Sequence, residues 1–271
     1  MYSEVPPPDR LAPLVECFWT IRSDGPLTTS RLNRVLPDGC SDIIFNFGDP
    51  PAGRGAAYHR LHAFVVGTMR TAVNVWLKGS VDLLGIRFRP GGALAVTAVP
   101  ANELTDRVVP LEEVLPTAGA IESRLADIGV TERLAVLTGL IEGRLSRARM
   151  EPDPRVRHAA GLIERHDGRV SVEAIARDVN LSRRQLERLF HRTVGSTPKE
   201  ACRVARFRAA VRRMHRERTL SLSRLAHATG FHDQSHMARE FRRLGGITPA
   251  GYLEEISGRS NAVSGVPSAL A

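Results

Sequence analysis

Residues 181–198 read LSRRQLERLFHRTVGSTP, and residues 231–249 read FHDQSHMAREFRRLGGITP, which repeats the same pattern. Five positions recur 50 residues apart, and after a one-residue insertion seven more recur 51 residues apart. The matched pairs are Val172/Leu222, Ile175/Leu225, Ala176/Ala226, Asn180/Gly230, Leu181/Phe231, Leu186/Met237, Arg188/Arg239, Phe190/Phe241, Arg192/Arg243, Gly195/Gly246, Thr197/Thr248 and Pro198/Pro249. Apolar residues match apolar residues and turn residues match turn residues, so the pairs indicate a duplicated structural unit.

Each copy has the pattern of a helix, a tight turn and a second helix. Apolar residues recur at helical spacing through residues 175–190. Asn180 and Gly230 fall where the turn requires a positive φ, which glycine adopts freely and asparagine tolerates. Ser182 is placed to cap the second helix of the first copy, and Asp233 the equivalent helix of the second. We therefore expect two helix-turn-helix units, with an all-helical bundle that binds no ligand as the alternative.

Basic charge is concentrated in this half of the chain. Residues 151–271 contain 22 basic and 13 acidic residues, whereas the first 150 residues contain 16 of each. Residues 181–220 alone contain 12 basic and 3 acidic residues. Such a surface attracts phosphate through counterion release, so a duplicated helix-turn-helix with this charge points to DNA.

One long helix is expected to join the two units. Thr197 provides its cap and Pro198 its first residue. The helical pattern runs to about residue 215, and roughly 18 residues at 1.5 Å each span roughly 27 Å. A rod of that length would hold two recognition helices roughly one DNA turn apart, on the order of 34 Å.

Four motifs of this half resemble one family. They are Leu181–Phe190, the Arg206-x-x-x-Ala210 of the joining helix, Gly230–Phe241 and Gly246-Ile-Thr-Pro249. Together they resemble the DNA-binding domain of AraC/XylS-type bacterial transcription regulators over residues 155–257. The resemblance implies that each unit places a recognition helix in the major groove.

The same resemblance assigns roles to individual side chains. It implies base-facing positions at Arg184, Glu187, Arg188, Gln234, Ser235 and Arg239, and phosphate contacts from Arg183, Arg192, Arg242 and Arg243; we add Arg212 of the basic joining helix to the phosphate contacts. Glu187 can accept a hydrogen bond from a cytosine amino group or pair with a neighbouring arginine. For Arg188 and Arg239 the alternative is an ion pair beneath the recognition helix.

The first half of the chain has a different pattern. Short runs rich in Val, Ile, Phe and Trp, separated by Pro, Gly and Asp turns, lie at 14–22, 31–36, 41–47, 63–67, 72–78 and 81–89, and helical patterns follow at about 118–128 and 131–148. Several short strands without intervening helices favour a small antiparallel barrel or sandwich. The predicted fold class is α+β with two domains: an N-terminal antiparallel β-barrel or sandwich with two following helices, and a C-terminal all-α double helix-turn-helix.

The domain boundary is expected at Glu151-Pro-Asp-Pro154, where two prolines interrupt a helical pattern. The chain then divides into a β-rich sensor or dimerisation domain (1–150), the DNA-binding domain (151–257) and a disordered tail (258–271). The motifs Pro37–Phe45, Arg87–Gly92 and Leu104–Asp106 resemble an uncharacterised N-terminal domain that accompanies AraC-type DNA-binding domains. That resemblance implies an architecture but no ligand.

The interior of a barrel can hold a small-molecule effector. The candidate lining residues are Trp19, Cys40, Phe45, Phe47, His62, Trp76 and Arg87, each with a core or turn role as its alternative. The second of the two helices carries an apolar stripe at Leu134, Leu137, Ile141 and Leu145, which fits either a homodimer contact or packing on its own barrel. The N-terminal half is thus a ligand sensor or purely a dimerisation or protein-contact module.

Catalytic and metal functions have less support. His232 and His236 have the i, i+4 spacing of a zinc pair but lack the glutamate that serves as base in a zinc protease. No phosphate loop, dinucleotide fingerprint or nucleophile elbow occurs. We expect no catalytic residues, metal or cofactor, with a catalytic barrel fused to the DNA-binding domain as the alternative.

The chain opens without a signal-peptide pattern, has no apolar run long enough to span a bilayer, and has three widely spaced cysteines, as in reduced cytoplasmic proteins. We therefore expect a cytoplasmic protein that does not contact a membrane. Its expected partners are double-stranded DNA, a small-molecule effector, a second copy of the chain, and RNA polymerase if it is an activator.

Overall fold

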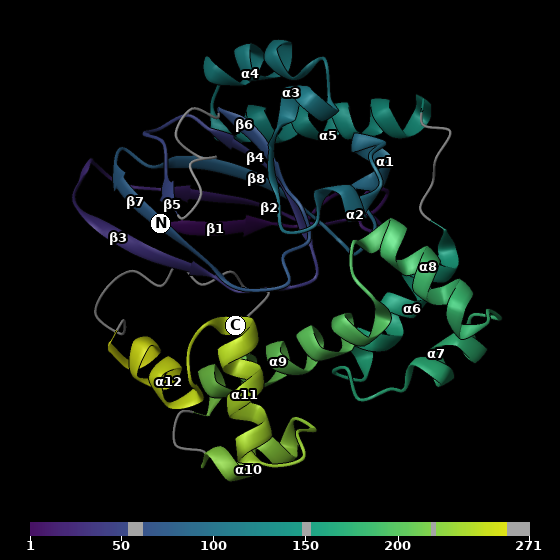
Figure 1. Ribbon diagram of the computed structural model, residues 1–271. Helices are drawn as coiled ribbons and strands as arrows, with labels where there is room; N and C mark the ends of the chain where they lie inside the picture. The colour runs from purple at the N-terminus through teal and green to yellow at the C-terminus, as the bar shows by residue number, and fades with distance from the viewer. Residues whose placement is uncertain (54–61, 148–152, 218–220, 259–271) are drawn as a thin grey trace.

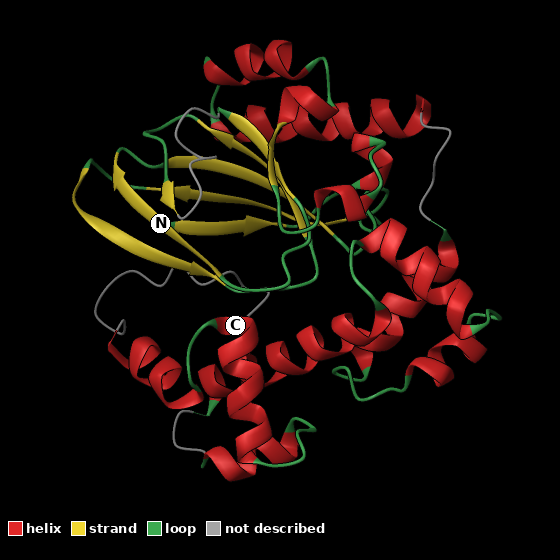
Figure 2. Cartoon of the chain, viewed as in Figure 1, coloured by secondary structure: helices red, strands yellow, loops and turns green. Residues whose placement is uncertain are grey.

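The computed structural model describes residues 1–53, 62–147, 153–217 and 221–258. Its strands are β1 (Tyr2–Val5), β2 (Val15–Arg22), β3 (Leu27–Val35), β4 (Ser41–Asn46), β5 (Ala52–Gly53), β6 (Ala63–Val66), β7 (Val73–Gly79), β8 (Asp82–Phe88) and β9 (Val108–Pro110). Its helices are α1 (Leu94–Thr97), α2 (Ala101–Leu104), α3 (Leu111–Val114), α4 (Ala118–Ala126), α5 (Val130–Arg147), α6 (Pro154–Arg165), α7 (Val172–Asp178), α8 (Arg183–Val194), α9 (Pro198–Arg216), α10 (Leu222–Ala228), α11 (Gln234–Gly245) and α12 (Pro249–Gly258). The strands belong to the N-terminal part and the C-terminal part is helical, which confirms the predicted fold class (Figures 1 and 2).

Two antiparallel sheets build the N-terminal domain. One has the strand order β1-β2-β8-β4-β6-β9 and the other the order β3-β7-β5. The six strands expected from the apolar runs are all present, whereas β1, β5 and β9 were not expected. These three strands have four, two and three residues, too few to show the alternation that identifies a strand in a sequence.

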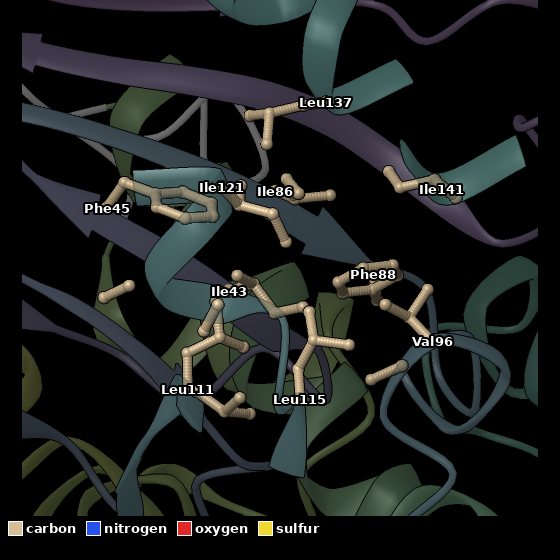
Figure 3. Packing of buried hydrophobic residues seen from close by; sticks show 14 of the residues in the cluster. Ile43, Phe45, Ile86, Phe88, Val96, Leu111, Leu115, Ile121, Leu137 and Ile141 are labelled. Carbon is tan, nitrogen blue, oxygen red and sulfur yellow. The ribbon is translucent and has the colours of Figure 1, made fainter. Parts of the chain in front are cut away.

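Helices cover one face of the six-stranded sheet. In Figure 1, α3, α4 and α5 lie above that sheet, on the side away from the C-terminal helices. Ile43 and Phe45 of β4 and Ile86 of β8 are buried together with Ile121 of α4 and Leu137 of α5 (Figure 3). Side chains that alternate with these, such as Ile44 of β4 and Leu83 of β8, face the other sheet, so β4 and β8 contribute to two layers.

The apolar stripe of α5 packs on its own domain. Leu137 and Ile141 are completely buried in the core of the N-terminal domain, and Leu134 and Leu145 pack against the same cluster. The stripe was expected either to form a homodimer contact or to pack on its own barrel, and the structure shows that it packs on its own domain. A homodimer contact would need another surface.

The C-terminal domain contains two helical cores that share α9. The first consists of α6, α7 and α8 with Cys202 of α9. The second consists of α10, α11 and α12 with five buried residues of α9, and its centre is an edge-to-face contact between Phe207 and Phe241 at 4.7 Å between ring centroids. The joining helix has 19 residues, so it spans roughly 28 Å at 1.5 Å per residue.

The expected domain boundary lies partly outside the described residues, because Glu151 and Pro152 are among those not described. Asp153 caps α6 by accepting a hydrogen bond from the Arg155 amide at 2.9 Å, with Pro154 as the first helical residue. Residues 259–271 of the expected tail also lie outside the described residues, whereas Gly258 ends α12. None of the described helices is long and apolar enough to cross a bilayer.

We predict that Leu137→Ala lowers the free energy of unfolding by about 2–5 kcal/mol, because it leaves a cavity in a closed core. Urea denaturation measures this change, with Ala135→Ser on the exposed face of α5 as the control. A variant of normal stability that instead changes its oligomeric state in light scattering would show that the stripe is an intermolecular contact.

Candidate nucleic-acid interface

The first recognition helix, α8, begins at a complete capping box. The Ser182 hydroxyl accepts a hydrogen bond from the Gln185 amide at 3.3 Å, and the Gln185 side chain accepts one from the Ser182 amide at 2.9 Å. The helix buries Leu186 and Phe190 in the first core and leaves Arg188 exposed. The cap therefore fixes where the helix starts, and the apolar spacing fixes which side faces outward.

The second recognition helix, α11, is built in the same way. Asp233 caps it by accepting a hydrogen bond from the His236 amide at 2.7 Å. Met237 and Phe241 are buried, whereas Arg239 is exposed. The turns before the two helices have left-handed residues at the predicted positions, with φ of 53° at Asn180 and 77° at Gly230.

Exposed side chains form equivalent rows on the two helices. Positions 184, 188 and 192 follow one another at i, i+4 spacing on α8, and positions 235, 239 and 243, each 51 residues later, do so on α11. All six are exposed; they are Arg184, Arg188, Arg192, Ser235, Arg239 and Arg243. Gln234 and Arg242 of α11 are also exposed, so each of the two units of the C-terminal domain has a polar surface on its recognition helix.

Two of the alternatives for these residues can be compared with the geometry. Among the described residues, neither Arg188 nor Arg239 forms an ion pair. The alternative role of these two arginines, an ion pair beneath the recognition helix, is therefore not present in the structure. Glu187, in contrast, is held at 2.9 Å by the Arg183 side chain, which also contacts Glu173 at 2.8 Å. The base-facing roles themselves stay predictions.

The arginines of α9 mostly bind protein groups. Arg203 pairs with Glu240 of α11 at 2.8 Å, and Arg206 donates to the Gly168 carbonyl at 2.9 Å. The guanidinium of Arg212 pairs with Asp167 at 2.8 Å and is half-buried at the edge of a hollow between the two domains, and its phosphate contact stays a prediction. The arginines of α9 have these partners because α9 lies between both units and the N-terminal domain, where its long side chains contact protein on several sides.

The N-terminal domain contacts the carboxyl ends of both recognition helices. At the end of α8, the Thr68 hydroxyl donates to the Val194 carbonyl at 2.6 Å and the Thr105 hydroxyl donates to the Gly195 carbonyl at 2.7 Å. Gly195 has φ of 85°, and a Cβ there would lie 2.5 Å from the Thr105 hydroxyl, so both conformation and space require glycine. These hydroxyls satisfy carbonyls that a helix end leaves without partners.

The end of α11 receives the equivalent contacts. The Ala72 amide donates to the Leu244 carbonyl at 2.6 Å, and the Arg34 guanidinium donates to the Gly245 carbonyl at 3.3 Å. Arg34 also pairs with Glu255 of α12 at 3.3 Å. Val194 and Gly245 are equivalent residues of the repeat. The N-terminal domain therefore donates a hydrogen bond to the same carbonyl position at the end of each recognition helix.

A cavity of about 120 Å³ lies between the two sheets of the N-terminal domain. Its lining is mainly apolar and comes from both sheets; it consists of Tyr2, Trp19, Ile21, Asn33, Arg34, Val35, Leu36, Asp38, Asp42, Ile44, Pro51, Phe64, Val66, Met69, Val73, Val75, Leu77, Leu83 and Arg87. Of the seven effector candidates from the sequence, only Trp19 and Arg87 line it. Tyr2, Asp38 and Asp42 were not expected there.

The other five effector candidates lie elsewhere. Phe45 is in the core beneath the helices, and Phe47 packs against that core under the Arg133 guanidinium. Cys40 lines the hollow between the domains. His62 and Trp76 are exposed, the latter with 43% of its surface accessible.

One end of the cavity holds a buried arginine among carboxylates. Arg87 is only 6% exposed, and its guanidinium lies 3.4 Å from both Asp38 and Asp42 and 3.8 Å from Glu4. Asp42 accepts a hydrogen bond from the Trp19 indole at 2.7 Å. Burial raises the pKa of Asp42 to about 6, although Arg87 acts in the opposite direction.

The histidines of the second unit have ordinary partners. His232 pairs with Asp233 at 3.0 Å, and His236 lies edge-on to the Phe231 ring. The described part of the chain contains no cluster of three or more side chains suited to hold a metal ion.

Two family models match the chain. Residues 3–110 match a domain of unknown function (DUF6597), and residues 175–255 match a helix-turn-helix domain. A transcriptional regulator from Chromobacterium violaceum with an AraC-type DNA-binding domain is 31% identical; the match covers 41% of this chain and 96% of that chain, with a TM-score of 0.36. No curated protein matches the chain.

Longer but more distant matches are found with ToxT from Vibrio cholerae. The O395 protein is 10% identical with a TM-score of 0.47, and the match covers 89% of this chain and 98% of that chain. A form with bound unsaturated fatty acid is 12% identical with a TM-score of 0.46, and the match covers 86% and 94% of the two chains.

The repeated units and the matched helix-turn-helix model define a DNA-binding protein. With the 31% identical regulator, they show that the chain belongs to the AraC-type transcription regulators, with a DUF6597 domain at its N-terminus. This family consists of regulators and not of enzymes, so the alternative of a catalytic barrel has no support from it.

We predict that Glu240→Gln destabilises the second unit by about 1–3 kcal/mol, because Arg203 would lose its charged partner. The hydrogen bond from Arg203 lowers the pKa of Glu240, so the pair stabilises the fold above the usual glutamate pKa and loses its effect as the pH falls through the lowered value. The difference between wild type and variant in urea denaturation should therefore shrink below about pH 4. A difference that is constant down to pH 3 would contradict this role.

Proposed function

We propose that this AraC-type regulator reads one asymmetric DNA site with both recognition helices, and that a ligand or partner of its N-terminal domain modulates the binding. The observation that carries the proposal is the pair of equivalent exposed rows on α8 and α11. Both helices pack on α9, which spans roughly 28 Å, close to one turn of DNA at roughly 34 Å. One chain would thus meet two blocks on one face of the duplex.

Base contacts are proposed for Arg184, Glu187 and Arg188 of α8 and for Gln234, Ser235 and Arg239 of α11. An arginine without an ion pair in the free protein can bind guanine bidentately without first breaking a contact. Arg188 and Arg239 meet that condition among the described residues. Phosphate contacts are proposed for Arg183, Arg192, Arg212, Arg242 and Arg243. Arg183 and Arg212 have carboxylate partners in the free protein, which a phosphate would replace.

Modulation by the N-terminal domain is supported by its contacts with both recognition helices. The hydrogen bonds at Val194, Gly195, Leu244 and Gly245 connect each helix end directly to that domain. A shift of the N-terminal domain would therefore change how α8 and α11 are held. The distant ToxT structure with bound fatty acid shows a ligand only for that protein.

The test of site reading is a selection of preferred sites from a random duplex pool by the purified full chain at about 150 mM salt. Two enriched blocks spaced by about 10 base pairs are expected. A single block would mean that only one unit reads bases. Binding without any motif, fading steeply with salt, would contradict the sequence-specific function.

We predict that Arg188→Ala and Arg239→Ala each weaken binding to the selected site by about 1–3 kcal/mol and relax base choice in different blocks. Repeated selection with each variant measures both effects. Arg124→Ala, an exposed residue of α4, is the charge-matched control. Loss of helicity with unchanged base preference would show that these arginines have a structural role.

Arg192→Ala and Arg243→Ala should behave differently. We predict that they weaken binding to all sequences about equally and reduce the slope of log affinity against log salt by about 1, because a phosphate contact carries no sequence information. Titrations of specific and scrambled duplexes over a range of salt concentrations measure this. A change in base preference would place these side chains in the groove instead.

A further inference from the structure

The cavity between the sheets has an apolar body and a polar end. Trp19, Ile44 and Phe64 of the six-stranded sheet face Val73, Val75 and Leu77 of the three-stranded sheet. Arg87, Asp38 and Asp42 line the same cavity and come close together. A molecule placed inside would therefore meet apolar walls and one charged group of side chains.

The guanidinium of Arg87 is incompletely satisfied. Its Nε and Nη1 atoms are buried and have no hydrogen-bond partner among the described residues, although three carboxylates lie within 3.8 Å of the guanidinium. Leaving a buried donor without an acceptor costs about 1–3 kcal/mol, and more for a charged group. Buried groups of this kind call for a specific explanation, and a missing acceptor in the adjoining cavity provides one.

The surrounding charge limits what that acceptor can be. Glu4, Asp38 and Asp42 place three carboxylates around one arginine, so an additional anion would be repelled. A cationic amine would suit the carboxylates, but it would be repelled by Arg87 and would leave Nε and Nη1 without an acceptor. A neutral group can accept from one of the two unpartnered Arg87 nitrogens and donate to Asp42 without adding a charge.

The volume of the cavity limits the size of the apolar part of the ligand. At about 120 Å³ it is slightly smaller than an engineered apolar cavity of roughly 150 Å³ that binds benzene. We propose that the cavity binds a neutral molecule with one ring-sized apolar body and one hydroxyl or amide group, which accepts from Arg87 and donates to Asp42. The inference deepens the proposed modulation and rests on it only for its effect on DNA.

The wall of the cavity also belongs to the domain interface. Arg34 lines the cavity and binds Gly245 and Glu255, and the Asp38 carbonyl accepts a hydrogen bond from Arg208 of α9 at 3.0 Å. Leu36 lines the cavity and is part of the core of the second helix-turn-helix unit. Occupation of the cavity is therefore transmitted to α11 through residues 34–38.

A matched series of benzene derivatives tests the ligand class. Benzamide and benzyl alcohol carry the neutral polar group, whereas benzoate, benzylamine and toluene carry an anion, a cation and no polar group. Calorimetric titration of the full chain at pH 7.5 should give binding of a neutral probe that is at least about tenfold tighter than that of the other three, as expected when a buried hydrogen-bonding group is lost. Titration of the selected duplex with and without benzamide measures the transmitted effect.

Three variants make the test specific to the cavity. Val75→Phe should fill it and abolish binding, whereas Trp76→Phe, at the next and outward-facing position of β7, should leave binding unchanged. Asp42→Asn removes one carboxylate and keeps an acceptor for Trp19, so it should narrow the preference for benzamide over benzoate by more than about threefold. If Asp42 had a purely structural role, Asp42→Asn would lower the affinity for benzamide and for benzoate by the same factor.

Each contrary outcome overturns a defined part of the proposal. Equal binding of benzoate or benzylamine would refute the neutral polar group, and equal binding of toluene would refute the role of Arg87. No binding of any probe, or binding that survives Val75→Phe, would refute the site. Binding of benzamide with unchanged affinity for the duplex would refute transmission through residues 34–38. Duplex selection without any probe tests the proposed function separately, so the two failures are distinguishable.

Discussion

The capping of both recognition helices by the N-terminal domain is the constraint on which the arrangement of the molecule depends. A helix leaves its last carbonyls without internal partners, and water, a side chain or another element must supply donors. In this chain Thr68, Thr105, Ala72 and Arg34 supply them to α8 and α11. The two units are therefore joined to each other by α9. The carboxyl ends of their recognition helices are also both bound to the N-terminal domain.

The joining helix contacts all three parts of this arrangement. Cys202 near its start belongs to the first core, whereas Phe207 and Met214 belong to the second. Arg208 adds a hydrogen bond to the Asp38 carbonyl of the N-terminal domain. Because α9 takes part in two cores and in the domain interface, most of its arginines form ion pairs or hydrogen bonds within the protein. The number of basic residues in α9 therefore overestimates how many arginine side chains are available to bind DNA.

The features that the sequence predicts well are local. The caps at Ser182 and Asp233 and the left-handed turns at Asn180 and Gly230 depend on a few neighbouring residues, and the structure has each of them. The repeat adds the order of the units and the length of the joining helix. Two helices near residues 118–148 follow from their apolar spacing for the same reason.

The lining of the cavity is hard to predict from the sequence because its residues come together only through the pairing of strands. In β4 the side chains of Asp42 and Ile44 face the cavity, while those of Ile43 and Phe45 face the helices. Alternation reveals that there are two faces but not which face encloses a cavity, so the sequence alone does not distinguish Asp42 from Phe45 as a lining residue. The available signal was the acidic residue inside the apolar run Ser41–Phe47. A charged residue in such a run indicates a buried polar contact, although the partner, Arg87, becomes evident only from the register of β4 and β8.

The two contacts with the recognition helices differ in how closely they are linked to the cavity. Arg34 lines the cavity and binds the end of α11, and Val73 of its wall follows Ala72, which binds Leu244. Thr68 and Thr105, which bind the end of α8, do not line the cavity, but Met69, which follows Thr68, does. A ligand that moves the wall therefore acts on α11 directly through Arg34, and on α8 only through Met69, the neighbour of Thr68. The energetic effect of a ligand on DNA binding is limited by its different affinities for the two arrangements. Its influence should consequently be greatest on the block of the DNA site that α11 reads.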